Sequence, residues 1–418
     1  MKLLKKPPMG WNSWDCYGAA VKEEQVRRNA EYMAAHLKEF GWEYIVVDIQ
    51  WYEPGAVSHE YNRGAELVMD GFGRLMPAVN RFPSAAGGKG FKPLADYVHS
   101  LGLKFGIHIL RGIPRQAIRL NPPVMGTEFR AAEIADFGNV CPWNGDMCGV
   151  DMGRAGAQEY YDSIFRLYAD WGVDFVKVDD IARPYHREEV EGIAGAIKNS
   201  GRDMVLSLSP GAAPVAQAEH LSEWANMWRM TDDFWDNWEL LKKMFDYCRE
   251  WFPYTGENHF PDCDMLPLGR IRLCNTENGE ETHFTADEQK LLMSLWAIFR
   301  SPLMFGGDMT MNDTFTLSLM QNREIIDINQ NSWGGREVYR KGNEIAWAAY
   351  GPDHKVYLAH FNVGDEEIAV DFNTEYIGMK EKVEAYEVWD GEGQCGVSRV
   401  KSVIPPHGVR LYVIRGWV

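Results

Sequence analysis

AQEYYDSIFRLYADWGVDFVKVD, residues 157–179, passes from a helix pattern through a glycine into a strand pattern. Aromatic and aliphatic residues recur at helical spacing in the first part, Gly172 gives a stop signal, and a mostly apolar run then ends at Asp179. Apolar strands of this kind are typical of a parallel sheet that is covered by helices on both faces. The stretch therefore predicts one unit of an α/β fold.

The same unit recurs from the N-terminus to residue 308. The clearest strand patterns are EYIVVD (43–48), LKFGIHI (103–109), VDFVKVD (173–179), MVLSLS (204–209) and MWRMTDD (227–233). With PMGW near the start, the weak HFPDCDM segment and a final PLMFGGD, the strands number about eight, which predicts a (β/α)8 TIM barrel. An open doubly wound sheet is the alternative. No strand is followed by Gly-x-Gly-x-x-Gly, so its dinucleotide-binding form is disfavoured.

The pattern changes near residue 330, where short alternating strands are separated by turn residues. They predict an antiparallel β-sandwich. We therefore expect a catalytic barrel over residues 1–328 and a C-terminal antiparallel β-domain over residues 329–418. Residues 111–160 contain no convincing strand, so we expect a long excursion from the barrel that shapes the rim of the active site.

Composition narrows the choice of partner. The net charge of −17 argues against nucleic acid and anionic membranes, which both need a basic surface, and favours a neutral substrate. The sequence has no run of 18 apolar residues and no signal-peptide pattern, so we expect a cytoplasmic protein. The seven scattered cysteines are typical of free thiols, although Cys141 and Cys148 could bridge under oxidising conditions. No spacing suggests zinc, and we expect neither a metal nor a cofactor.

Polar residues stand where the predicted barrel strands end, and a barrel carries its catalytic groups at those ends. They are Asp48, His108, Lys177, Asp179, Ser207, Ser209, Arg229, Asp233 and Asp264. Several of the 16 tryptophans flank acidic residues, as Trp14 flanks Asp15. An aromatic face beside a carboxylate suits a sugar, because the C–H face of the ring stacks while its hydroxyls bind the carboxylate. We expect Trp14 to contact such a ligand; core packing is the alternative for any single tryptophan.

Side chains alternate along a strand, and this alternation places two carboxylates on the barrel axis. Lys177 shares a face with Asp179, and Arg229 shares a face with Asp233. We interpret Asp179, kept ionised by Lys177, as a nucleophile, and Asp233 as an acid/base residue. A pair of this kind, at the short separation of a retaining enzyme, would hydrolyse a glycoside by double displacement.

The neighbouring acids Asp180 and Asp232 are the alternatives to this pair. Alternation points them away from the barrel axis, and an aspartate at a strand end often caps the next helix. For His108 we favour a structural polar contact over the role of a catalytic base.

Seven motifs stand in a fixed order along nearly the whole chain: PPMGWNSW, GWEYIVVDIQW, WGVDFVKVDD, WRMTDD, DCDML, LLMSLWAIFRSPLMFGGDM and IIDINQNSWG. In this order they resemble glycoside hydrolase family 27, which contains α-galactosidases and α-N-acetylgalactosaminidases. The resemblance implies a barrel followed by an antiparallel β-domain, with Asp179 as nucleophile and Asp233 as acid/base. It also implies that sugar hydroxyls are bound by Asp48, Lys177, Arg229 and Asp264.

The chain departs from the family pattern at positions that contact the sugar. Ile49 stands where the family usually has a second acidic residue that holds the sugar's upper hydroxyls, and His108 stands where the family has a tyrosine. SLSPGA (207–212) is similar to the form found in α-N-acetylgalactosaminidases, because the small Ser209 and Ala212 leave room for an N-acetyl group. The Pro-Gly within this segment differs from the family forms.

These features predict a retaining exo-glycosidase for terminal α-linked galactose-type residues, either an α-N-acetylgalactosaminidase or an α-galactosidase. Its partner would be an oligosaccharide or glycoconjugate, and a homo-oligomer is left open. Because of Ile49, a β-L-arabinopyranosidase or an enzyme for isomaltose-type glucans is the alternative specificity. A transglycosylase shares the same residues. A non-catalytic carbohydrate-binding protein on this fold is the last alternative, and the intact carboxylate pair argues against it.

Overall fold

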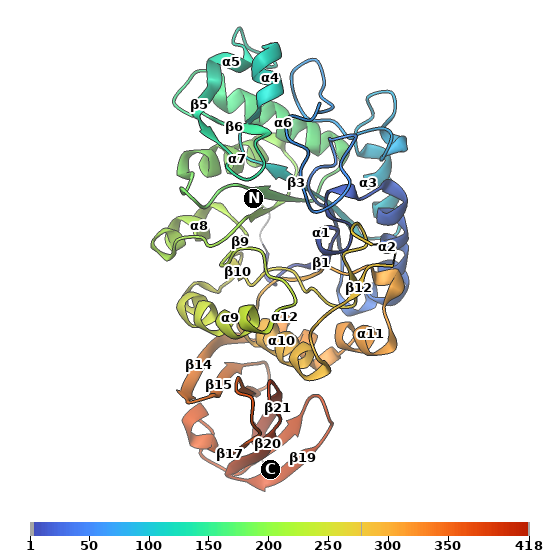
Figure 1. Ribbon diagram of the computed structural model, residues 1–418. Coiled ribbons are helices and arrows are strands. Elements are labelled where there is room, and N and C mark those ends of the chain that lie inside the picture. Colours follow the sequence, from blue (N-terminus) through green and yellow to red (C-terminus); the bar gives the residue numbers. More distant parts are fainter. Residues whose placement is uncertain (1–3, 277, 417–418) are drawn as a thin grey trace.

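The computed structural model describes residues 4–276 and 278–416. Within them, eight strands form one parallel sheet (Figure 1), which closes because Leu266, just beyond the last edge strand, forms a parallel bridge with Phe305. The predicted (β/α)8 barrel is confirmed. In spatial order the strands are β10 (Phe260–Asp262), β9 (Met227–Arg229), β8 (Val205–Leu208), β7 (Phe175–Asp179), β3 (Lys104–Leu110), β2 (Tyr44–Val47), β1 (Met9–Asn12) and β13 (Leu303–Phe305).

Helices surround this sheet, and their ends follow local sequence signals (Figure 1). The helix within the opening stretch ends at Gly172, whose φ of 85° lies in the left-handed region. Thr285 and Glu288 form the expected capping box, with backbone-to-side-chain distances of 2.8 and 3.3 Å. The helices are α2 (Glu23–His36), α3 (Lys92–Ser100), α6 (Ala157–Trp171), α7 (Arg187–Ser200), α8 (Ala218–Trp224), α9 (Trp238–Trp251), α10 (Ala286–Phe299), α11 (Thr314–Met320) and α12 (Arg323–Asn331).

The excursion between β3 and α6 contains a small antiparallel sheet, so the expectation of no strand there is wrong. Strand β6 (Met147–Val150) lies between β4 (Ile113–Pro114) and β5 (Ala135–Val140), and the helices α4 (Arg115–Leu120) and α5 (Ala131–Ile134) complete the unit. The strands are short, and β5 carries a bulge, so no regular alternation reveals them in the sequence. Gly112 allows the backbone before β4 to approach β6 closely. Its φ is 91°, and a Cβ there would lie 1.9 Å from the carbonyl oxygen of Cys148.

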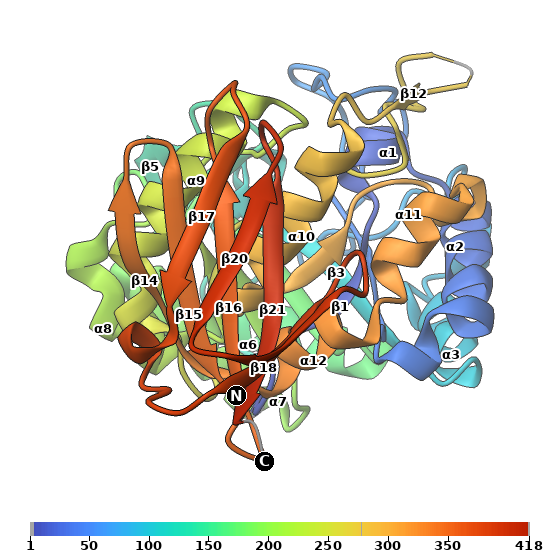
Figure 2. The ribbon, with the colours of Figure 1, turned by 90° about the horizontal axis from the view of Figure 1, so that it is seen from below.

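The C-terminal part forms the predicted antiparallel β-sandwich (Figure 2). A six-stranded sheet of order β14-β15-β16-β21-β18-β19 faces the pair β17-β20 across a small core that includes Leu358, Phe372 and Ile414. The predicted boundary at 328/329 falls inside α12. The strands are β14 (Trp333–Lys341), β15 (Glu344–Tyr350), β16 (Val356–Asn362), β17 (Ile368–Asn373), β18 (Val383–Glu387), β19 (Gly393–Val397), β20 (Arg399–Ile404) and β21 (Val409–Gly416).

The sandwich packs against the barrel through specific polar and aromatic contacts. His407 stacks on Trp238 of α9, with ring centroids 3.7 Å apart, and its Nδ1 lies 2.8 Å from Glu288 of α10. Trp389 Nε1 donates to Ser294 Oγ of α10 over 2.9 Å. The outer helices α9 and α10 therefore form the barrel's side of the interface with the sandwich.

Two further expectations concern the state of the cysteines and the presence of membrane-spanning segments. All seven cysteines lie in the described part of the chain as free thiols, as predicted, and both Cys141 and Cys148 are buried. Within residues 4–276 and 278–416, no helix is long and apolar enough to cross a membrane.

Candidate active site

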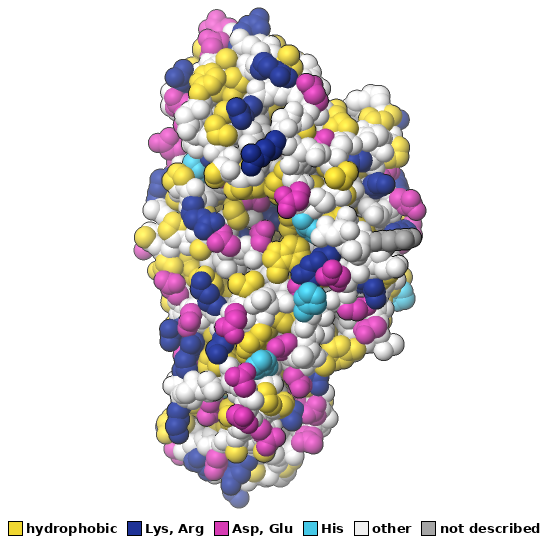
Figure 3. All heavy atoms as spheres, viewed as in Figure 1, with side chains coloured by type: hydrophobic (Ala, Val, Ile, Leu, Met, Phe, Trp, Pro, Cys, Tyr) yellow, Lys and Arg dark blue, Asp and Glu magenta, His cyan; other side chains and the backbone are white. Residues whose placement is uncertain are grey.

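A cavity of about 420 Å³ opens at the carboxyl ends of the barrel strands, a size typical of small-molecule sites. Figure 3 views this face of the molecule, where hydrophobic and charged side chains meet around the centre of the barrel. Both predicted catalytic aspartates line the cavity. Its lining residues are Trp14, Asp48, Ile49, His59, Tyr61, Trp143, Lys177, Asp179, Arg183, Pro210, Asp232 and Asp233.

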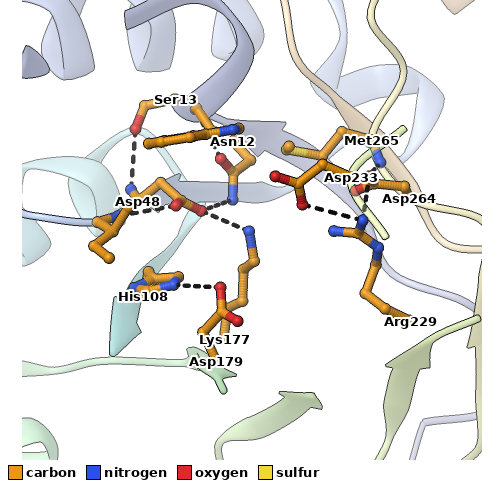
Figure 4. Close-up of polar contacts among 12 residues, drawn as sticks. Asn12, Ser13, Asp48, His108, Lys177, Asp179, Arg229, Asp233, Asp264 and Met265 are labelled. Carbon is orange, nitrogen blue, oxygen red and sulfur yellow. Dashed lines mark hydrogen bonds and ion pairs between the residues drawn. The ribbon is translucent and has the colours of Figure 1, made fainter. Parts of the chain in front are cut away.

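Asp179, the last residue of β7, is fixed at both carboxylate oxygens. His108 Nε2 on the neighbouring strand β3 lies 3.0 Å from Oδ2, and the backbone N–H of Asp180 donates to Oδ1 over 2.7 Å. Both donors stabilise a negative charge. His108 is fully buried. It is the structural polar contact that the sequence suggested, but its partner is the predicted nucleophile itself (Figure 4).

A second ion pair lies beside this carboxylate. Lys177 Nζ contacts Asp48 Oδ2 at 2.9 Å, and Asn12 Nδ2 donates to the same oxygen over 2.7 Å. Burial alone would raise the pKa of Asp48, but Lys177, then His108 and the hydrogen bonds, lower it to about 2. Conversely, Asp48 and then Asp179 raise the pKa of Lys177 against the effect of burial. The cavity wall therefore holds a fixed anion and a fixed cation for sugar hydroxyls.

Asp233 reaches the cavity from a loop rather than from a strand. Because β9 ends at Arg229, the alternation argument does not extend to residue 233. Instead, Arg229 Nη2 lies 2.5 Å from Asp264 Oδ2 and 3.3 Å from Asp233 Oδ1. Asp264 also accepts the N–H of Phe234 over 2.6 Å, which fixes the residue directly after Asp233. The Asp233 side chain is 52% exposed.

The alternative aspartates both form ion pairs with arginines, and of the two only Asp232 lines the cavity. Asp180 pairs with the buried Arg111 at 2.8 Å and does not line the cavity, as alternation predicted. Burial raises its pKa to about 6, although Arg111 opposes this. Asp232 pairs with Arg183 at the cavity mouth, and both side chains are largely exposed. Neither aspartate caps the next helix, because α7 and α9 begin after His186 and Asn237.

The loop after β8, which the sequence predicts to form the pocket for a C2 substituent, does not place the predicted residues on the cavity wall. Ser209, directly after β8, is buried, its N–H donates to the Val178 carbonyl over 2.8 Å, and its hydroxyl has no partner among the described residues. The loop contributes Pro210 to the cavity wall, whereas Ser209 and Ala212 are not among the lining residues.

The aromatic wall of the cavity contains the predicted Trp14 and three residues that the sequence analysis did not name: His59, Tyr61 and Trp143. Trp14, on the short helix α1 (Trp14–Tyr17), lies with its ring roughly parallel to Tyr61 at 6.1 Å, and Tyr61 contacts Trp143 at 5.6 Å. His59 lies edge-on to Trp14 at 4.9 Å. His59 and Tyr61 come from the loop after β2, and Trp143 comes from the excursion. The aromatic residues in these loops were the available signal, but no periodicity places them.

The residues described here offer acid–base groups rather than a metal centre. No group of three or more histidine, cysteine, aspartate or glutamate side chains within residues 4–276 and 278–416 is arranged to hold a metal ion. The arrangement instead places two carboxylates, a lysine and an arginine around one cavity.

Comparisons with known proteins agree with this geometry. The family model described as alpha galactosidase A matches residues 145–331, and the alpha galactosidase C-terminal beta sandwich domain matches residues 341–414. A crystal structure of a family 27 β-L-arabinopyranosidase from Geobacillus stearothermophilus, in complex with arabinose, is 53% identical with a TM-score of 0.97, covering 99% of this chain and 98% of that chain. An α-galactosidase from Cyamopsis tetragonoloba is 29% identical over 99% of this chain and 87% of its own length. An α-N-acetylgalactosaminidase from Gallus gallus is 28% identical over 82% of this chain and 75% of its own length.

A closed barrel with paired carboxylates at its carboxyl face, joined to a β-sandwich of this kind, defines a glycoside hydrolase. The matches along both domains make the assignment more specific. The chain belongs to glycoside hydrolase family 27.

Proposed function

We propose that the enzyme is a retaining exo-glycosidase that prefers terminal β-L-arabinopyranosyl residues and cleaves α-D-galactosides more slowly. The observation that carries this proposal is Ile49, an apolar side chain that lines the cavity directly beside the charged Asp48. The similarity to the Geobacillus stearothermophilus β-L-arabinopyranosidase supports it.

The two sugars differ at one substituent. β-L-Arabinopyranose has the ring hydroxyl configuration of α-D-galactopyranose but lacks the hydroxymethyl group on C5. An acid at position 49 would accept a hydrogen bond from that hydroxymethyl group, whereas Ile49 offers no acceptor. A hydroxyl that loses its water partners without replacement costs about 1–3 kcal/mol, which corresponds to about 5- to 150-fold in affinity. The apolar wall therefore favours the pentose.

The proposed reaction is a double displacement. The Asp179 carboxylate attacks the anomeric carbon while the bond to the leaving oxygen breaks and Asp233 donates its proton to that oxygen. A water then attacks the anomeric carbon, Asp233 takes its proton, and the ester bond to Asp179 breaks. The donors on Asp179 favour the anion needed at the start and at the end. The exposed Asp233 faces the side open to the leaving group and to water.

α-N-Acetylgalactosaminides are the second candidate substrates. The small residues Ser209 and Ala212 in the loop after β8 favour them at the level of the sequence. Neither residue lines the cavity, whereas Pro210 does. We rank these substrates below the arabinopyranoside.

The test compares the nitrophenyl β-L-arabinopyranoside, α-D-galactoside, α-N-acetylgalactosaminide and α-glucoside by kcat/KM. We expect the arabinopyranoside to be the best substrate, and proton NMR to show that the first sugar released keeps its anomeric configuration. Ile49→Asp should raise the galactoside-to-arabinopyranoside ratio by about tenfold or more, whereas Ile49→Val should leave it unchanged. A wild-type preference for the galactoside, or a ratio that Ile49→Asp does not alter, would reject the assignment. Inversion at the anomeric carbon would reject the mechanism.

A further inference from the structure

A second and larger cavity, of about 710 Å³, lies at the other end of the barrel, where the barrel meets the sandwich. We call it the junction cavity. Lys5 and Lys6 precede β1, Arg300 precedes β13, and Trp333 begins β14, so these lining residues stand before the strands rather than after them. The catalytic aspartates follow their strands. The junction cavity is therefore separate from the active site.

The junction cavity is positively charged although the chain carries a net charge of −17. Its basic side chains belong to Lys5, Lys6, Arg300 and Arg336, and Glu257 is the acidic residue in its lining. Within residues 4–276 and 278–416, no ion pair to a carboxylate is recorded for any of these four cations, whereas basic residues elsewhere form many such pairs. Four basic side chains against one acidic side chain leave the lining with a net positive charge, which attracts an anion.

Arg300 shows that this charge is built into the fold. The residue is 8% exposed, and its Nε donates to the carbonyl of Asn329 over 3.1 Å. Its Nη2 lies 3.5 Å from the carbonyl of Lys5. The two carbonyl oxygens orient the guanidinium, and Glu257 is the carboxylate that attracts it, so the positive charges of Lys5, Lys6 and Arg336 remain for a ligand.

Two residues of the lining carry buried hydroxyls without a hydrogen-bond partner in the described part of the chain. Ser332 is 3% exposed, and neither its Oγ nor Thr255 Oγ1 has a partner among the described residues. Buried polar atoms are normally paired, so either hydroxyl would gain a partner if its side chain rotated towards a polar group in the cavity. Both residues line the junction cavity.

An aromatic face completes the lining. Trp333 is 52% exposed and is followed by Gly334 and Gly335. Gly335 is required here, because a Cβ would lie 2.2 Å from the carbonyl oxygen of Ile298. An exposed indole beside basic side chains suits a sugar ring that carries C–H groups and a negative charge.

We propose that the junction cavity binds an acidic sugar, a uronic acid residue of an oligosaccharide, with its carboxylate on the basic side chains and its ring on Trp333. Such a site would hold the enzyme on an acidic polysaccharide while the active site, at the opposite end of the barrel, remains free. The proposal is independent of the sugar that is cleaved.

The experiment titrates the full chain with trigalacturonate by isothermal calorimetry, with neutral galactotriose and sodium sulfate as parallel ligands. We expect trigalacturonate to bind, with an affinity that falls as salt is added, and we expect galactotriose not to bind. Lys6→Gln and Arg336→Gln should each weaken binding by about fivefold, and Trp333→Ala should weaken it further. Lys341→Gln, which removes an exposed lysine from the same strand as Arg336 but outside the cavity, is the matched control and should bind as the wild type does.

Activity on the nitrophenyl substrates provides the second readout and should be unchanged in all four variants, since none of these residues lines the active site. Absence of trigalacturonate binding would overturn the proposal. If galactotriose binds as tightly as trigalacturonate, the role of charge is overturned. If sulfate binds as tightly as trigalacturonate, the site recognises any anion, and the proposal of an acidic sugar is overturned. Unchanged affinity in Lys6→Gln, Arg336→Gln and Trp333→Ala would place the ligand elsewhere.

Discussion

Asp232 and Asp233 are adjacent in the chain but differ in what surrounds them. Asp233 lies beside Arg229 in the cavity, whereas Asp232 forms an exposed pair with Arg183 at the mouth. We expect Asp233→Asn to lower kcat/KM by about 10²- to 10⁴-fold, because it removes the proposed proton donor. Asp232→Asn is the matched control and should change it by only about threefold, since exposed ion pairs contribute little. The two variants are compared on the best nitrophenyl glycoside, and equal losses would contradict the assignment.

His186 links the stability of the protein to pH. Burial, followed by Arg111, lowers its pKa to about 4 from the ordinary 6.5. Between these two values the unfolded chain binds a proton that the folded chain does not bind, so stability is complete above pH 6.5 and falls as the pH drops towards 4. In His186→Gln, the Tm should therefore decrease less between pH 7 and about 4.5 than it does in the wild type. His354→Gln, at an exposed position, should follow the wild type; an identical slope for His186→Gln would exclude this linkage.

At the level of elements, the excursion depends on the close approach at Gly112. Gly112→Ala should lower the free energy of unfolding by about 1–3 kcal/mol, because its φ of 91° disfavours a side chain and the added Cβ would meet the Cys148 carbonyl. Gly126, in the same excursion, has a φ of 80° and open space around its Cα. Gly126→Ala is therefore the control for backbone conformation alone and should cost less. Denaturant unfolding measures both, and equal losses would show that the contact contributes nothing.

The elements also show what a sequence can predict. The capping box at Thr285 and the stop at Gly172 are local signals, and the structure contains both. Asp179 could be placed because β7 extends to it. Asp233 was expected in the cavity on the argument of strand alternation, whereas Asp264 and Arg229 position it from a loop. Tyr61 and Trp143 could not be placed, because contacts between distant loops determine where they lie.

At the level of the whole molecule, His407 connects the two domains. Its ring stacks on Trp238, and its nitrogens lie 2.8 Å from Glu288 and 3.1 Å from Asp365. His407→Ala should weaken the junction by about 1–2 kcal/mol and make the sandwich unfold at a lower temperature than the barrel in calorimetry. His354→Ala is the control: like His407, His354 has a positive φ in the sandwich, but it lies on the surface. A single unshifted transition in His407→Ala would contradict this role.

The closure of the barrel has a consequence for its motion. Strand β10 does not pair with β13 directly; Leu266 bridges to Phe305 instead, with its N–H on the Met304 carbonyl at 2.8 Å. This seam is a single bridge, whereas every other junction of the barrel pairs at least two residues on each strand, so its amides should exchange with deuterium earlier than those of β7 or β3. Asp264, whose carboxylate accepts the N–H of Phe234 beside the proposed acid/base residue Asp233, lies two residues before Leu266. Opening of the seam is therefore expected to loosen the loop that carries Asp233.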